Sequence, residues 1–261
     1  MTRTFKVAIA AITVAAALIP ASASATILQL GDQAGIAPVA SPTCPAGSTV
    51  NCTIILTKTT ALETLSNGVF YPTTVRTAGK IVAFTVGLAR LTKAEISGLD
   101  SAYGGTSQIA ITVLKPGKNR LWTVRSESPL FHVQPWFGQV VQFPLTTTLD
   151  AKPGDAVALT VNTWAPILSI GLSSKQFQYR ASRTTGCTAF NIQTAQLTIG
   201  ANTMYKCFYV ATRVQYSATE VTTPVVPKSA VHAPRKTVRR TTRVLAGAAT
   251  ANATPTGGVA P

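Results

Sequence analysis

The feature that most constrains this chain is the alternation of large apolar residues with small or polar ones over several short segments. In Lys80–Arg90, valine, phenylalanine, valine and leucine occupy four successive alternate positions. The same period of two recurs in Gln108–Lys115, Asp155–Val161 and Met204–Tyr216. Alternate residues of a β-strand point to opposite faces, so each segment is predicted to be a strand with one apolar face. Strands of this kind are typical of antiparallel sheets packed face to face.

Weaker strand patterns fill most of the remaining sequence between residues 52 and 180. They are Cys52–Thr57, Arg120–Arg125, Pro129–Val133, Gln139–Thr147, Ile167–Leu172 and Phe177–Arg180. About ten strands in roughly 170 residues, with no βαβ alternation, predict an all-β fold. We expect an antiparallel β-sandwich of the jelly-roll type with short helical connectors.

Two segments have the spacing of a helix capping box, in which a hydroxyl residue is followed three positions later by glutamate. They are Thr60–Glu63 and Thr92–Glu95. Asn67-Gly68 and Gly98 are placed to end the two helices, because glycine adopts the left-handed conformation of a helix C-terminus. Each is therefore predicted to be a connector of one or two turns.

The first 25 residues have the features of an export signal. A short basic region with Arg3 and Lys6 precedes an apolar run, and Ala23-Ser24-Ala25 offers small residues for cleavage. The alternative is a transmembrane anchor, but the run from Val7 to Ile19 is shorter than the roughly 20 residues that a membrane-spanning helix needs. We expect a secreted protein that is cleaved after Ala25 and has no transmembrane segment.

The four cysteines are consistent with two disulfides in an exported protein. Three pairings of Cys44, Cys52, Cys187 and Cys207 are possible, and we favour Cys44–Cys52 with Cys187–Cys207 because both are local in sequence. A zinc site is the competing interpretation. The chain has no C-x-x-C pair and no histidine at a matching spacing, so no metal is predicted.

The composition divides the chain into four parts. Residues 1–25 are the signal, 26–45 an irregular lead-in, 46–223 the β-sandwich domain, and 224–261 a Pro/Ala/Thr-rich tail predicted to be disordered. The tail has six basic residues and no acid; they are Lys228, Arg235, Lys236, Arg239, Arg240 and Arg243. A basic flexible segment attracts polyanions without specificity, so the tail either binds an anionic surface polymer or serves as a solvated linker.

The low acid content weakens most enzyme hypotheses. The chain has 8 Asp+Glu against 23 Lys+Arg, a formal net charge of +15. The sandwich segment contains a single histidine, His132, and no G-x-S-x-G motif. Its candidate carboxylates for glycoside hydrolysis are Glu95, Asp100, Glu127, Asp150 and Asp155, of which the last two flank one turn. Because turns and caps explain these acids, no catalytic residue and no cofactor are predicted.

The tryptophans are the candidate ligand-binding residues, because flat sugar faces stack on aromatic rings. Trp122 lies in a predicted strand and is interpreted as sheet packing. Trp136 and Trp164 lie in predicted loops, and Trp136 is close in sequence to His132. Packing explains these residues too, but Trp136, Trp164 and His132 are the residues on which we place a possible carbohydrate platform.

One segment carries a resemblance. Leu149–Leu159 contains a strand end, a Gly-Asp turn and an alternating strand, and it follows Ile109–Lys115, Ser128-Pro129-Leu130 and Phe143–Leu145 in order. This arrangement is similar to that of uncharacterised exported jelly-roll β-sandwich proteins of high-GC Gram-positive bacteria. The resemblance extends over about residues 80–216 and implies architecture only.

The sequence as a whole predicts a secreted, non-enzymatic protein that acts at or near the cell envelope. Its expected partner is a polysaccharide or an anionic surface polymer. A structural or interaction protein without a small ligand is the alternative, and a secreted glycan hydrolase is a third. No helix-turn-helix, zinc-finger or RNP motif is present, so no specific nucleic-acid partner is expected.

Overall fold

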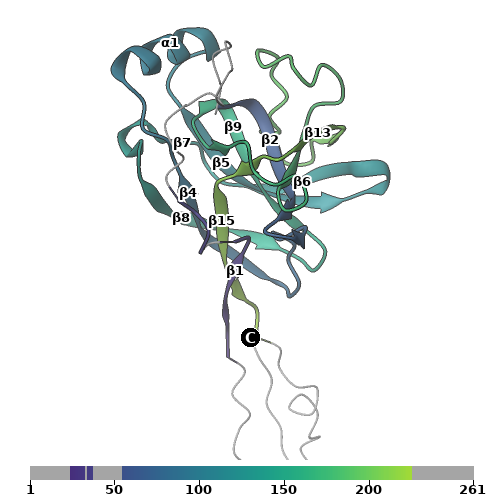
Figure 1. Cartoon of the computed structure of the whole chain (residues 1–261). Coiled ribbons are helices and arrows are strands. Elements are labelled where there is room, and N and C mark those ends of the chain that lie inside the picture. The colour runs from purple at the N-terminus through teal and green to yellow at the C-terminus, as the bar shows by residue number, and fades with distance from the viewer. Residues whose placement is uncertain (1–23, 33, 38–54, 225–261) are drawn as a thin grey trace, which may run out of the picture. The chain divides into compact units, whose positions relative to one another are not determined.

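The computed structural model of the chain describes residues 24–32, 34–37 and 55–224, all within one unit of the chain (Figure 1). Strands dominate these residues, and every strand pair is antiparallel. The prediction of an all-β sandwich of antiparallel sheets is therefore confirmed. Among the described residues, no helix has both the length and the apolar character needed to cross a membrane.

The larger sheet has nine strands, seven of them in one hydrogen-bonded series. In order across the sheet these are β12 (Asn202–Met204), β6 (Leu121–Glu127), β5 (Gln108–Pro116), β9 (Ala156–Ala165), β2 (Leu56–Ser66), β11 (Gln178–Ala181) and β13 (Cys207–Val210). Two short strands extend it, because β3 (Val69–Phe70) pairs with β2 and β7 (Phe131–His132) pairs with β5.

The smaller sheet lies beside β5, β9 and β2 in Figure 1. Its four strands are β1 (Ile27–Leu30), β15 (Tyr216–Thr222), β4 (Gly79–Gly87) and β8 (Val140–Ala151), in that order. A further two-stranded ladder joins β10 (Leu168–Ser169) to β14 (Arg213–Val214).

The main apolar core lies between the two sheets. Phe84, Ile111 and Leu159, which the alternation assigns to apolar strand faces, are fully buried there. Phe84 packs against Phe131 and Phe143 with ring centroids 5.2 and 5.3 Å apart. The period of two therefore identified these three inward positions of β4, β5 and β9 correctly, whereas in β13 the apolar set with Phe208 and Val210 is exposed.

The opposite face of the larger sheet is also buried at its centre, which the alternation did not indicate. Thr112 on β5 and Thr160 on β9 occupy the alternate positions that point away from the apolar strand faces, yet both are fully buried. A second apolar cluster lies on this outer face and comprises Leu62, Leu114, Val124, Ala156, Ala158 and Tyr205. Something other than the smaller sheet must therefore cover the outer face.

The two expected helical connectors had different outcomes. Thr92 caps helix α1 (Lys93–Tyr103) through the predicted capping box with Glu95, but the helix runs for 11 residues, passes Gly98 and ends at Gly104 (φ 90°). The prediction of a helix at Thr60–Glu63 is wrong, because these residues lie within strand β2. Tertiary pairing with β9 and β11 outweighs a local capping pattern there.

The dipeptide Asn67-Gly68 forms a hairpin turn instead of ending a helix. Both residues have positive φ, 50° and 80°, as a two-residue turn between β2 and β3 requires. The predicted long strand Met204–Tyr216 is also broken into parts of β12, β13, β14 and β15. Ala211 interrupts it with a φ of 54°, which strand geometry does not allow.

Candidate functional site

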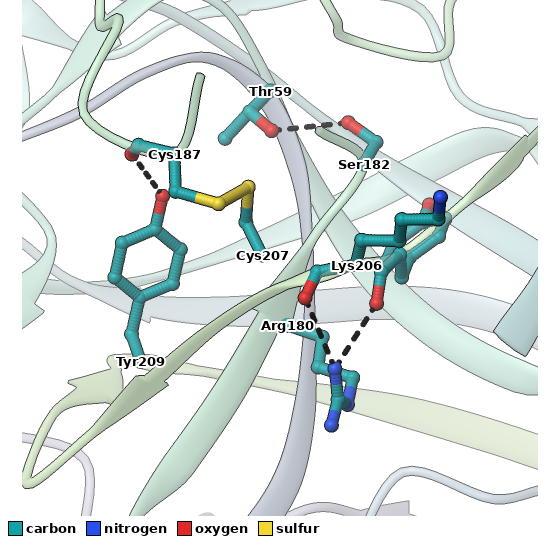
Figure 2. The surroundings of a disulfide bond; sticks show 8 residues. Thr59, Arg180, Ser182, Cys187, Lys206, Cys207 and Tyr209 are labelled. Carbon is teal, nitrogen blue, oxygen red and sulfur yellow. Dashed lines mark hydrogen bonds between the residues drawn. A yellow bond between two sulfur atoms is a disulfide. The ribbon is translucent and has the colours of Figure 1, made fainter. Parts of the chain in front are cut away.

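The segment from Ser182 to Lys206 covers the outer face of the larger sheet. It leaves the end of β11 and returns to β13, and a disulfide joins Cys187 to Cys207 with Cα atoms 5.3 Å apart (Figure 2). This pairing is confirmed. The other predicted pair, Cys44–Cys52, lies outside the described residues. Tyr209 donates a hydrogen bond to the Cys187 carbonyl at 2.5 Å. The disulfide and this hydrogen bond both attach residues 182–206, which we call the cover, to β13.

Hydroxyl groups of the sheet bond directly to this cover. The Thr60 and Thr112 hydroxyls both lie within hydrogen-bond distance of the Thr160 hydroxyl, at 2.8 and 2.6 Å. The Gln196 backbone N–H donates to the Thr60 hydroxyl at 2.9 Å, and the Ser182 hydroxyl lies 3.0 Å from that of Thr59. These threonines are buried because the covering segment replaces water as their hydrogen-bond partner.

Aromatic rings and an arginine remain accessible beside the cover. The Tyr71 and Trp122 rings lie 6.4 Å apart, and Trp122 meets the edge of the buried Tyr205 ring at 6.4 Å. Arg180 donates to the Tyr205 carbonyl at 3.2 Å and stacks its guanidinium 4.5 Å from the Phe208 ring centroid. We call this surface the aromatic–arginine patch and define it as Tyr71, Trp122, Arg180 and Phe208.

The strand pairing explains why these side chains share one face. Arg180 is paired with Leu62 on β2 and with Phe208 on β13, and Leu62 belongs to the outer cluster. Their neighbours Tyr179 and Ala181 have the opposite parity and face the inner core. Tyr71 is 40% exposed and Phe208 is 44% exposed, whereas Trp122 and Arg180 are half-buried. The patch therefore has a half-buried centre, formed by Trp122 and Arg180, and two accessible edges, formed by Tyr71 and Phe208.

Basic residues surround the patch. The tight connection between β5 and β6 includes the 3-10 turn η1 (Lys118–Arg120), in which Asn119 and Arg120 have φ of 54° and 63°. Lys115, Lys118 and Arg120 are all exposed on this hairpin. The charge of Arg120 lowers the pKa of Arg180, after the larger effect of burial, and the two guanidinium groups therefore lie near one another.

The acidic residues leave this positive charge uncompensated. The described residues contain all eight acids and 15 basic residues, a net charge of +7. Each acid is buried, paired with a basic side chain or engaged in a hydrogen bond or cap; they are Asp32, Glu63, Glu95, Asp100, Glu127, Asp150, Asp155 and Glu220. The outward-facing charge is therefore predominantly positive.

Two of these acids have strongly raised pKa values. Burial raises the pKa of Glu63 from its ordinary value of 4.5 to about 8, although Arg213, with its Nε 4.0 Å from the carboxylate, acts in the opposite direction. Burial likewise raises the pKa of Glu127 to about 7, against a lowering hydrogen bond with Thr112. Both carboxyls are substantially protonated near neutral pH, which further reduces the negative charge of the domain.

The structure corrects the prediction for Trp164. The sequence places this residue in a loop and offers an exposed platform as the alternative to packing, but it lies in strand β9 and is 0% exposed, as the packing interpretation requires. Its indole donates to Asp100 Oδ1 at 3.1 Å and to the Gly105 carbonyl at 2.9 Å, which ties helix α1 to the sheet. Trp164 is therefore a packing residue, and it does not form a groove with Trp136.

Trp136 and His132 lie near the surface as expected. Trp136 is in the 3-10 turn η2 (Gln134–Trp136), is 41% exposed and meets the edge of Phe143 at 6.4 Å. His132 is exposed, and its Nδ1 lies 3.1 Å from the Thr106 hydroxyl. Their role in ligand binding stays a prediction.

The carboxylates that flank the Lys152–Asp155 turn have separate partners. Asp155 is buried and accepts bonds from Arg125 at 2.5 and 3.0 Å and from the Lys152 backbone at 2.9 Å. Asp150 is exposed and pairs with Lys80. Among residues 24–32, 34–37 and 55–224, no three His, Cys, Asp or Glu side chains are grouped so as to hold a metal ion. The six predicted polyanion-binding residues of the tail lie outside the described residues.

Sequence reasoning missed most of the aromatic–arginine patch. Trp122 was interpreted as packing only, and Tyr71, Arg180 and Phe208 were not singled out. Phe208 carried a signal, because Cys207 and Tyr209 have the opposite parity and one of the two sets must face outward. No local pattern places Tyr71 against Trp122, since 51 positions separate them in the chain.

Comparison with family models, curated proteins and solved structures finds no match to this chain.

Proposed function

We propose that this chain is an exported, non-enzymatic protein that binds an anionic polysaccharide of the cell envelope through the aromatic–arginine patch. The observation that carries the proposal is the contact of the exposed Phe208 ring with the Arg180 guanidinium, on a domain that has 15 basic residues and eight acids among its described residues. The confirmed disulfide is compatible with an extracellular location.

The chemistry of the patch fits a charged sugar polymer. Tyr71 and Phe208 offer exposed aromatic side chains to the apolar side of a pyranose, and the Arg180 guanidinium beside Phe208 would donate hydrogen bonds to a carboxylate or sulfate. Lys118 and Arg120 extend the positive surface beyond Trp122. A long polymer contacts both the rings and the basic hairpin, whereas a single sugar reaches only one of them.

Affinity measurements on three polymers test this proposal. Heparin and polygalacturonate present sulfates and carboxylates, and dextran is a neutral control of similar flexibility. We expect both anionic polymers to bind and dextran not to bind. The double substitution Tyr71→Ala and Phe208→Ala should weaken binding about tenfold with little effect on stability, because both side chains are largely exposed.

Trp136→Ala is the matched control, because it removes an exposed ring of comparable accessibility away from the patch. It should leave the affinity unchanged. If Trp136→Ala weakens binding and the Tyr71/Phe208 variant does not, the site lies at η2 and the proposal is wrong.

The basic tail is expected to add a salt-dependent contribution. Removal of residues 224–261 takes away six positive charges and leaves the +7 of the described residues. Retention on a heparin column should therefore decrease at low salt but not vanish. Complete loss of retention would show that the tail alone binds.

A further inference from the structure

Arg183 is a buried charge at the start of the covering segment. It lies two residues after the end of β11, and its carbonyl accepts hydrogen bonds from the Lys206 and Cys207 backbones at 3.2 and 3.1 Å. The residue is only 1% exposed, which is rare for an arginine unless a partner compensates its charge. The neighbouring disulfide at Cys207 keeps the backbone in this position.

The partners of this guanidinium are incomplete. One terminal nitrogen donates to the Thr57 carbonyl at 2.6 Å, and the Phe190 ring centroid lies 5.7 Å from the guanidinium carbon. The Nε–H is buried and has no hydrogen-bond partner. Among the described residues, no carboxylate oxygen lies within 4.0 Å of its nitrogens. A buried cation without a counter-ion is costly, so this guanidinium is suited to bind an anion.

A pocket of about 170 Å³ lies beside this side chain. Its walls are largely apolar and aromatic and include Ile55, Leu168, Ile170, Tyr179, Phe190 and Tyr209. The Tyr179 and Tyr209 rings stack with centroids 4.7 Å apart. Burial raises the pKa of Tyr179 above its usual range and the Arg183 charge opposes this, so the phenol and the guanidinium face the same space.

We propose that this pocket binds a small organic monocarboxylate with its charged group on Arg183. The apolar and aromatic walls would enclose a hydrocarbon body the size of one ring, because an apolar cavity of about 150 Å³ accommodates benzene. The unpartnered Nε–H supplies a charge-assisted hydrogen bond to the carboxylate. The pocket shares no residue with the aromatic–arginine patch, so this site is independent of polysaccharide binding.

Calorimetric titration of the full-length protein at pH 7 tests the site with two probes of equal shape. Benzoate is ionised at this pH, and benzamide is its neutral counterpart. We expect saturable binding of benzoate, with a dissociation constant at least tenfold lower than that of benzamide. Equal affinities, or no saturable binding of benzoate, would overturn the proposal.

Two substitutions localise the binding. Arg183→Met removes the charge and should weaken benzoate binding at least tenfold, whereas Arg76→Met, at an exposed arginine, should leave it unchanged. Ile170→Trp fills the pocket from a half-buried wall position and leaves Arg183 intact, so it remains informative if Arg183→Met does not fold. Unaltered benzoate binding in the Ile170→Trp variant would overturn the proposal.

Discussion

The two faces of the larger sheet are both buried at its centre, but by different means. The inner face packs apolar side chains such as Ile111 and Leu159 against the smaller sheet. The outer face pairs the hydroxyls of Thr112 and Thr160 and lies beneath a segment attached by the Cys187–Cys207 disulfide. The inner face is therefore stabilised mainly by the burial of apolar surface, whereas the outer face combines a smaller apolar cluster with hydrogen bonds and a crosslinked covering segment.

This difference explains where a binding surface can form. The centre of the inner face has no access to solvent, because another sheet covers it. The cover of the outer face is a single segment, and it leaves Tyr71 and Phe208 accessible while Tyr205 is buried. A single covering segment leaves aromatic rings of the sheet exposed, whereas a second sheet packed on the same face would bury them.

Truncation of the inner face should produce the largest loss of stability. Leu159→Ala should lower the free energy of unfolding by about 2–5 kcal/mol, since it removes buried methyl groups and leaves a cavity. Thr160→Val should cost about 1–3 kcal/mol, because it removes the hydrogen bonds that the Thr160 hydroxyl makes with the hydroxyls of Thr60 and Thr112. Thr147→Val, at an exposed position of β8, should cost almost nothing. Urea denaturation measures all three, and a negligible loss for Thr160→Val would mean that the outer face is not covered.

Removal of the disulfide should weaken chiefly the attachment of residues 182–206. Cys187→Ser with Cys207→Ser opens a loop whose ends are 20 residues apart and should cost about 3 kcal/mol. Amide hydrogen exchange should accelerate in residues 182–206 and change little at Ile109–Val113 in the inner core. Uniform acceleration across both regions would contradict a division of the sheet into two separately stabilised faces.

Glu63 makes stability depend on pH within the buried region. Its folded pKa of about 8 lies above the unfolded value of 4.5, so its contribution to stability is complete below pH 4.5 and disappears as the pH rises through 8. Between pH 6 and 9 the free energy of unfolding should fall by roughly 3 kcal/mol. Glu63→Gln should flatten this dependence. A dependence that persists in the glutamine variant would assign the effect to another group, such as Glu127.

The sequence predicted the fold where the evidence was local and periodic. Strands β4, β5 and β9, the capping box of α1 and the Cys187–Cys207 pair all follow from short-range patterns. It failed for Thr60–Glu63, where a capping pattern lies in a strand, and for Trp164, which a following Ala-Pro made resemble a loop residue. The aromatic–arginine patch could not be predicted from the sequence, because long-range strand pairing brings together its residues from β6, β11, β13 and the end of a hairpin.

The burial of the polar face of β5 and β9 could not be predicted from the sequence either. Nothing in the sequence around Thr112 or Thr160 separates a solvated threonine from one beneath a covering segment, because both have the same parity and composition. The cover is made by residues 182–206, which have few strand signals and were not assigned to any face. Its position became evident only from its hydrogen bonds to Thr60 and Thr59.

The indole N–H signals of the three tryptophans give the most direct test of the binding face, because each reports a different part of the molecule. Trp122 belongs to the aromatic–arginine patch, Trp136 lies at η2, and Trp164 is buried and bonded to Asp100. In ¹⁵N-edited NMR spectra, with signals assigned through single Trp→Phe variants, we expect polygalacturonate to shift the Trp122 signal and to leave those of Trp136 and Trp164 in place. A shift of the Trp136 signal with an unmoved Trp122 signal would contradict the proposed binding face.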